Sequence, residues 1–152
     1  MQVTIVAVGK MRRGALAALC QDYARRLPWT VTIREVEERR PIEGAARLAR
    51  EGALLLAALP GDVFPVALDE GGKRLDSAGF ALELARWRDQ SGGRLAFVIG
   101  GAGGLAPAVR ARCRAALSLG AMTWPHLLAR ALLLEQLYRA HAILSGHPYH
   151  RA

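Results

Sequence analysis

The chain has 152 residues, a length typical of one folded domain, and its composition of 52% hydrophobic and 22% charged residues is that of a globular protein. This composition excludes disordered and collagen-like proteins. A disulfide-stapled protein is also excluded, since Cys20 and Cys113 are the only cysteines and lie far apart in the sequence. No apolar run approaches the roughly 20 residues of a membrane helix, and no charged leader precedes the first strand-like run. We therefore expect a cytoplasmic protein that has no membrane partner.

The net charge of +8 points to an anionic partner. Residues 90–152 contain seven arginines and a single acidic residue, Glu135. This part of the chain is therefore expected to face a polyanion such as a nucleic acid, with a merely soluble basic surface as the alternative.

Strand-like and helix-like segments alternate along the whole chain. In chain order the sequence predicts a strand over 3–8, a helix over 13–27, a strand over 30–36, a helix over 42–59, a strand over 63–68, a helix over 77–90, a strand over 95–99, a helix over 105–116, a short strand over 117–119 and a long helix over 126–144. Because parallel strands need crossover helices, this alternation predicts a single α/β domain over residues 1–152, with a mainly parallel sheet flanked by helices. Pro65 lies inside a predicted strand, so we expect that strand to begin late or to lie at an edge.

Three loops that follow predicted strands are the expected ligand sites, since open α/β sheets bind ligands at the carboxyl ends of their strands. These loops are 68–73, 100–104 and 119–125. The glycine-rich loop 100–104 partly matches a dinucleotide fingerprint, but no acid follows it before Glu135 to hold a ribose. The loop is therefore either a mobile turn or a site for a nucleoside-type ligand without a pyrophosphate.

The predicted helix over 126–144 is apolar over more of its circumference than one sheet face requires. A homodimer built on this helix explains that width, and burial of the helix inside a monomer is the alternative. The terminal segment 147–152 combines two imidazoles, a phenol and a guanidinium. Judged by its residues alone it is a frayed end, and the histidine spacing does not support a metal site.

Several segments together resemble one known family. They are Leu68-Asp69-Glu70-x-Gly72-Lys73, Ile99-Gly100-Gly101-x-x-Gly104-Leu105, Met122-Thr123-Trp124-Pro125-His126, Glu135-Gln136-Leu137-Tyr138-Arg139-Ala140 and His147-Pro148-Tyr149-His150-Arg151. In this order the segments resemble the SPOUT-class methyltransferases of large-subunit (23S) ribosomal RNA, a family that methylates N3 of a pseudouridine. The similarity covers almost the whole chain. The chain departs from the family at Ala102-Gly103, where Pro-Glu is usual.

The resemblance implies a sheet whose C-terminal part is tied in a trefoil knot that holds S-adenosylmethionine. Carried over residue by residue, it assigns cofactor binding to Leu68, Gly100, Leu119, Gly120, Ala121, Met122, Thr123 and Trp124. It assigns catalysis to His147, Tyr149, His150 and Arg151, with one imidazole as base or orienting group and Arg151 stabilising negative charge. The implied partners are ribosomal RNA in the ribosome or its large subunit and a second copy of the chain, with neither membrane nor metal.

Three other functions stay open. The first is a SPOUT methyltransferase that acts on another RNA, such as transfer RNA. The second is a non-catalytic ribosome-assembly factor with the same fold. The third, which fits the motifs least well, is an NAD-dependent oxidoreductase. The short chain favours ribosomal RNA, since affinity must come from its own basic surface and from a large, preformed target.

Overall fold

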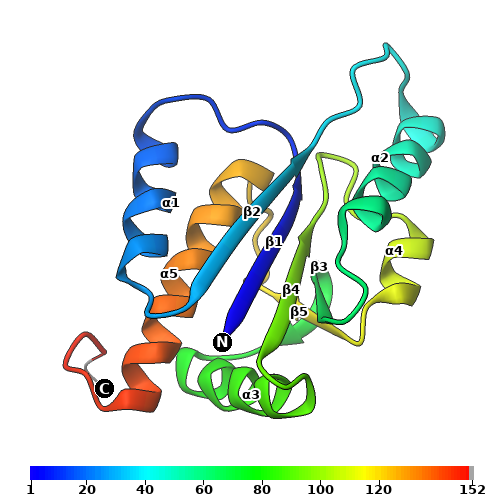
Figure 1. The fold of residues 1–152 in the computed structure, drawn as a ribbon. Coiled ribbons are helices and arrows are strands. Elements are labelled where there is room, and N and C mark those ends of the chain that lie inside the picture. Colours follow the sequence, from blue (N-terminus) through cyan, green and yellow to red (C-terminus); the bar gives the residue numbers. More distant parts are fainter. Residues whose placement is uncertain (151–152) are drawn as a thin grey trace.

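Five parallel strands form one sheet in the computed structural model, which describes residues 1–150 (Figure 1). The strands are β1 (Gln2–Val8), β2 (Thr30–Val36), β3 (Phe64–Arg74), β4 (Arg94–Ile99) and β5 (Ala115–Ser118). Their order is β2-β1-β4-β3-β5. Ile99 at the end of β4 lies opposite both Ala7 and Leu68, so the central strands reach the same edge of the sheet together.

Five helices cover the sheet. They are α1 (Ala15–Arg26), α2 (Gly44–Ala58), α3 (Ser77–Gln90), α4 (Pro107–Arg112) and α5 (His126–Ser145). Helices α1, α3 and α5 pack on one face, and α2 and α4 pack on the other (Figure 1). The predicted fold class, a mainly parallel sheet flanked by helices, is therefore confirmed, and the arrangement is consistent with the knot that the resemblance implies.

The alternation of side chains along β1 explains why both faces carry a core. Val3, Ile5 and Ala7 join the cluster under α1, α3 and α5, whereas Val6 and Val8 join the cluster under α2 and α4. All five of these side chains are buried. A strand covered on both faces needs apolar residues at consecutive positions, which is why this segment reads as a continuous apolar run.

The predicted helix over 105–116 is too long. The observed α4 begins with Pro107 at its first turn, where a proline fits, and ends at Arg112 because Cys113 is extended. The backbone N–H of Arg114 then donates to the carbonyl of Pro65 at 2.8 Å, and β5 follows from Ala115. Pairing with β3 thus gives an extended conformation to residues 113–116, which the local sequence pattern assigns to a helix.

Strand β3 is longer than predicted, because it resumes pairing after an irregular stretch. Leu68 and Lys73 both lie opposite Leu117, so the four residues between them leave the ladder. Gly72 lies against β5 so closely that an added methyl group would come within 2.7 Å of the backbone of Leu117. This close approach requires glycine, which explains a Gly-Gly pair where the sequence indicates a plain loop.

The expectation that Pro65 marks a late or edge strand is wrong. β3 lies between β4 and β5, and Pro65 is its second residue, opposite Ala96. The carbonyl of Pro65 faces β5, so its nitrogen faces that side too. Proline has no N–H to donate toward β5. Because β5 begins only at Ala115, no carbonyl of β5 lies opposite this nitrogen, and the proline is accommodated.

Much of the apolar surface of α5 is buried inside the chain. Leu133, Leu134 and Leu137 have no exposed surface, and α5 packs against both α1 and α3. Packing within one chain thus explains the width of this apolar surface. The homodimer stays a prediction, and the apolar surface of α5 no longer supports it. No helix among residues 1–150 is long and apolar enough to cross a membrane.

We expect Leu133→Ala to lower the free energy of unfolding by about 2–5 kcal/mol, because it opens a cavity in the core. The matched control on the same helix is Leu144→Ala, whose side chain is 43% exposed and whose loss is expected to change stability by less than about 0.5 kcal/mol. Urea unfolding followed by circular dichroism measures both. Equal effects would contradict the burial of Leu133.

Candidate functional site

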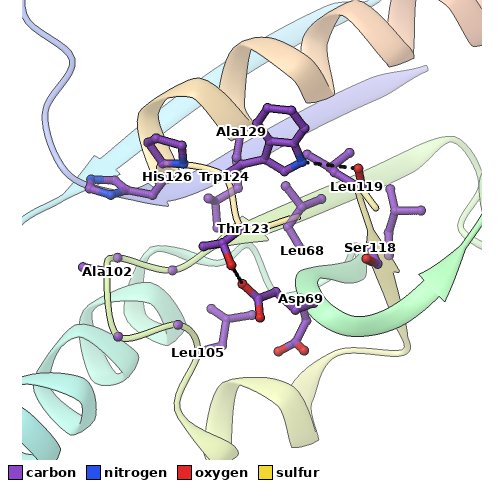
Figure 2. Close-up of a pocket in the computed structure, with 18 of the residues that line it drawn as sticks. Leu68, Asp69, Ala102, Leu105, Ser118, Leu119, Thr123, Trp124, His126 and Ala129 are labelled. Carbon is purple, nitrogen blue, oxygen red and sulfur yellow. Dashed lines mark hydrogen bonds between the residues drawn. The ribbon is translucent and has the colours of Figure 1, made fainter. Parts of the chain in front are cut away.

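A cavity of about 720 Å³ opens at the carboxyl ends of β3, β4 and β5 (Figure 2). Three loops and the first turn of α5 form its wall, and these are the loops that the sequence indicated. Of the residues predicted to bind the cofactor, those that line the cavity are Leu68, Gly100, Leu119, Gly120, Met122, Thr123 and Trp124. Ala121 is exposed and is not part of the lining.

The glycine loop after β4 folds tightly on itself. The amide of Gly104 donates to the carbonyl of Gly101 at 3.0 Å, and Gly104 has a φ of +80° that favours glycine. A methyl group at Gly100 would lie 2.2 Å from the carbonyl oxygen of Gly104. Gly100 is therefore needed for the shape of the loop, which leaves backbone, not side chains, facing the cavity.

The segment after β5 is held by its own hydrogen bonds. The hydroxyl of Ser118 donates to the carbonyl of Gly120 at 2.9 Å, and the indole of Trp124 donates to the carbonyl of Leu119 at 3.4 Å. Figure 2 shows the Trp124 ring over the cavity beside Leu119. Met122 is 72% exposed, so the segment also presents an unburied apolar side chain at the cavity.

Two carboxylates of β3 lie at the cavity. Asp69 forms an ion pair with Arg110 of α4 at 2.7 Å, and Glu70 accepts a hydrogen bond from the Thr123 hydroxyl at 3.0 Å (Figure 2). The second contact ties the irregular part of β3 to the segment after β5. The cavity thus combines an apolar cradle with acidic groups, a combination suited to a ligand with an aromatic part and a positive charge.

His126 forms the wall nearest to β1. Burial, together with repulsion from Arg130, lowers the pKa of His126 below its ordinary value. The ring lies so close to Gly9 that a methyl group there would come within 2.8 Å of Nε2. A neutral imidazole therefore joins the cavity to the loop after β1.

The C-terminal segment is not frayed over the residues that the structure describes. Tyr149 donates a hydrogen bond to Glu135 at 3.1 Å, and its hydroxyl lies 3.1 Å from that of Tyr23 on α1. Nδ1 of His150 lies 3.5 Å from the Arg139 guanidinium, and Nδ1 of His147 accepts from the Tyr149 amide at 3.2 Å.

The fourth predicted catalytic residue, Arg151, lies outside the described residues. The other three come together on one side of α5. Burial raises the pKa of Tyr149, and the hydrogen bond to Tyr23 and the Glu135 carboxylate act in the same direction. Tyr149 is therefore a hydrogen-bond donor at neutral pH, and it is no candidate for the base.

The described part of the terminal segment, residues 147–150, does not line the cavity of its own chain. Its contact residue Glu135 comes nine positions after His126 on α5, a rise of roughly 14 Å along the helix. Two groups that act on one reacting atom must both lie within a few ångströms of it. Within one chain the predicted cofactor residues that line the cavity are thus separate from His147, Tyr149 and His150.

Sequence reasoning did not assign a site role to Glu135, Arg139 or Tyr23. Glu135 and Arg139 form an ion pair, with Oε1 and Nε 3.0 Å apart. Their i, i+4 spacing and the isolation of Glu135 among arginines are signals that indicate this pair. No sequence signal indicates Tyr23, which reaches Tyr149 only through the packing of α1 on α5.

Ion pairs neutralise four of the seven arginines in residues 90–152, whereas Arg112 and Arg114 form none with residues 1–150. Arg94, Arg110 and Arg130 form ion pairs with Asp62, Asp69 and Glu35, all from the first half of the chain. Arg139 is paired with Glu135. The free positive charge of this part of the chain is therefore smaller than its composition indicates, and its role toward a polyanion stays a prediction.

We expect the free energy of unfolding to fall between pH 7 and pH 5, with part of that fall due to His126. Because the pKa of His126 is lowered on folding, its contribution is complete above the ordinary value of about 6.5 and is lost as the pH decreases toward the folded value. His126→Asn should reduce this dependence. Thermal unfolding at several pH values measures it, and identical profiles for the two proteins would contradict the buried neutral ring.

Comparison with known proteins places this geometry in a family. Residues 1–150 match the family described as "Predicted SPOUT methyltransferase". The chain is 50% identical over 152 residues to Ribosomal RNA large subunit methyltransferase H of Rhodospirillum centenum, with 100% of both chains covered. It is 52% identical over 151 residues to the protein of the same name from Paramagnetospirillum magneticum, with 99% of both covered.

A solved structure shares the fold at low sequence identity. The probable methyltransferase from Bordetella pertussis Tohama I matches with a TM-score of 0.57 and 16% identity, over 91% of this chain and 95% of that one. This likeness concerns the fold, whereas the family match and the two relatives concern nearly every residue of the chain. The chain belongs to the SPOUT methyltransferase family.

Proposed function

We propose that this protein transfers the methyl group of S-adenosylmethionine to the ribosomal RNA of the large subunit. The observation that carries the proposal is the 50% identity, over the full length of both chains, to a protein named for that activity. The cavity at the carboxyl ends of the strands supports it, since this is where the fold places a ligand. We place the reaction in the cytoplasm, on the ribosome or its large subunit, with one domain carrying it.

The cavity fits S-adenosylmethionine. Its volume of about 720 Å³ lies within the usual range for small-ligand sites. Leu68, Leu119 and Trp124 offer an apolar cradle for the adenine, and loop backbone offers hydrogen bonds to its edge. When bound, the cofactor supplies an electrophilic methyl group on a sulfonium cation, and the Glu70 carboxylate gives the site a complementary charge, whereas Asp69 is neutralised by Arg110.

We propose N3 of a pseudouridine as the methylated atom. This imide N–H is a weak acid between two carbonyls, so it must lose its proton before it can attack a methyl group. His147 and His150 are the candidate bases, and Arg151 is the candidate for stabilising the negative charge on the ring. Tyr149 stays protonated and donates its one hydroxyl hydrogen to Glu135, so we propose that it holds the terminal segment in place for the other groups.

A homodimer joins the two separate sites. In it the terminal segment of one protomer reaches the cavity of its partner, because that segment cannot act at the cavity of its own chain. Each active site then draws its cofactor residues from one protomer and its catalytic residues from the other. This gives the homodimer a chemical reason that does not rest on the apolar width of α5.

The glycine loop allows a matched test of the cofactor site. We expect Gly100→Ala to weaken S-adenosylmethionine binding by about tenfold or more, because the added methyl group would lie 2.2 Å from the Gly104 oxygen. Gly103→Ala is the control, since its methyl group would be 3.8 Å from its nearest neighbour, Leu48. Calorimetry measures both affinities. A folded Gly100→Ala protein with unchanged affinity would exclude this loop from the site.

Mixed dimers test the shared active site. A protein that lacks residues 147–152 and a Gly100→Val protein, whose branched side chain should abolish cofactor binding, should each be nearly inactive alone. Subunit exchange between them should restore about a quarter of the wild-type rate, because half of the dimers then contain one intact site of two. Mass spectrometry confirms the exchange. Exchange without recovered activity would show that the terminal segment acts within its own chain.

The decisive experiment maps methylated nucleosides by mass spectrometry in RNA from cells with and without this protein. The proposal expects the loss of one N3-methylated pseudouridine from large-subunit ribosomal RNA. Loss from transfer RNA would instead identify the alternative RNA substrate. Binding of S-adenosylmethionine with no lost methyl group would identify an assembly factor, and binding of NAD instead would identify an oxidoreductase.

A further inference from the structure

Three cations in the loop between β1 and α1 have no anionic partner. Lys10, Arg12 and Arg13 are all exposed, and none forms an ion pair with any residue in the range 1–150. By contrast, the neighbouring loop after β2 has its Arg39 and Arg40 paired with glutamates. The loop after β1 is thus a concentration of unneutralised positive charge at the edge of the sheet that holds the cavity.

Buried polar contacts fix this loop in place. Arg130 of α5 is only 1% exposed, and its guanidinium donates to the carbonyl of Gly9 at 3.0 Å and forms an ion pair with Glu35 of β2. Glu35 also accepts a hydrogen bond from the amide of Met11 at 2.9 Å. The start of the loop is therefore attached both to α5 and to β2.

The ion pair of the buried Arg130 with Glu35 contributes little net stability to the fold. Removing a guanidinium from water costs several kcal/mol, and Nε of Arg130 is buried with no partner among the described residues. A well-packed apolar side chain could fill this place in the core. What such a side chain could not do is hold the Gly9 carbonyl and the Met11 amide in one position.

The attached loop begins beside the cavity. Gly9 packs against the His126 ring, which lines the cavity, and a methyl group at Gly101 of the glycine loop would lie 3.0 Å from Val8 at the end of β1. Figure 2 shows the blue chain after β1 passing beside His126. The three cations follow Gly9 within four residues, in a loop that begins beside this wall of the cavity.

We infer that the loop of Lys10, Arg12 and Arg13 binds the phosphates of the RNA that flank the target nucleotide, and that Arg130 and Glu35 position it. This inference rests on the proposed function. RNA phosphates are the fitting occupant because three unpaired cations within four residues match the charge density of a nucleic-acid backbone. The loop thus adds affinity and alignment beside the cavity without contacting the cofactor.

The test compares two variants that each lose three positive charges. One is Lys10→Ala, Arg12→Ala, Arg13→Ala. The control is Arg25→Ala, Arg112→Ala, Arg114→Ala, three exposed residues that also form no ion pair with residues 1–150 and that lie at the end of α1, at the end of α4 and just before β5, where the strands begin. Binding to large-subunit particles is measured from 50 to 200 mM salt in the presence of S-adenosylmethionine, and cofactor affinity is measured separately by calorimetry.

For the loop variant we expect at least about tenfold weaker particle binding and a salt dependence whose logarithmic slope is lower by about 2 to 3, as for the loss of three phosphate contacts. Cofactor affinity should be unchanged. The control variant should keep the wild-type slope. Equal slopes for the loop variant and the wild-type protein, or a crosslink from the loop to ribosomal protein in place of RNA, would overturn the inference while leaving the proposed function intact.

The positioning pair has its own readout. Glu35→Gln should increase hydrogen exchange at the Met11 amide and raise KM for particles, with kcat and cofactor affinity close to wild type. Retained exchange protection with unchanged KM would remove Arg130 and Glu35 from the inference. If the wild-type protein methylates no RNA, the proposed function fails together with this inference, and that result is distinct from either of the others.

Discussion

All five strands run parallel, and this one constraint brings every functional loop to the same edge of the sheet. The register sets Leu68 opposite Ile99 and Ile99 opposite Ala7, so the irregular stretch of β3 after Leu68 and the loops after β4 and β1 begin at one level. The cavity and the basic loop after β1 are therefore neighbours although about 90 residues separate β1 from β4 in the chain. Binding of cofactor and of RNA can then be coordinated without a second domain.

Helix α5 serves both the core and the chemistry. Its leucines complete the apolar cluster, while His126 at its start lines the cavity and Glu135 and Arg139 farther along hold the terminal segment. Arg130 lies between these functions and is buried with an unpaired Nε. Because α5 packs against the sheet, α1 and α3, its apolar residues lie around much of the helix and do not form a single amphipathic stripe.

The sequence was sufficient for most elements and insufficient where distant segments decide the outcome. The boundaries of α3 match the prediction, since a local period and a local cap define that helix. Residues 113–116 were assigned to a helix because only pairing with β3 extends them. In the site, the chain positions of the loops were readable, but the contacts of Asp69 with Arg110 and of Glu35 with Arg130 join residues 41 and 95 positions apart. No local pattern encodes such pairs.

The place of β1 in the sheet also governs how the chain matures during synthesis. Val3, Ile5 and Ala7 are among the first residues made, yet the face they occupy is completed by α5, among the last. Whenever β1 pairs with β2, α5 cannot cover this apolar face until residues 126–145 have left the ribosome. The N-terminal half therefore exposes apolar surface for a time during synthesis. A truncated product of translation would lack α5 and would be prone to aggregate through this surface.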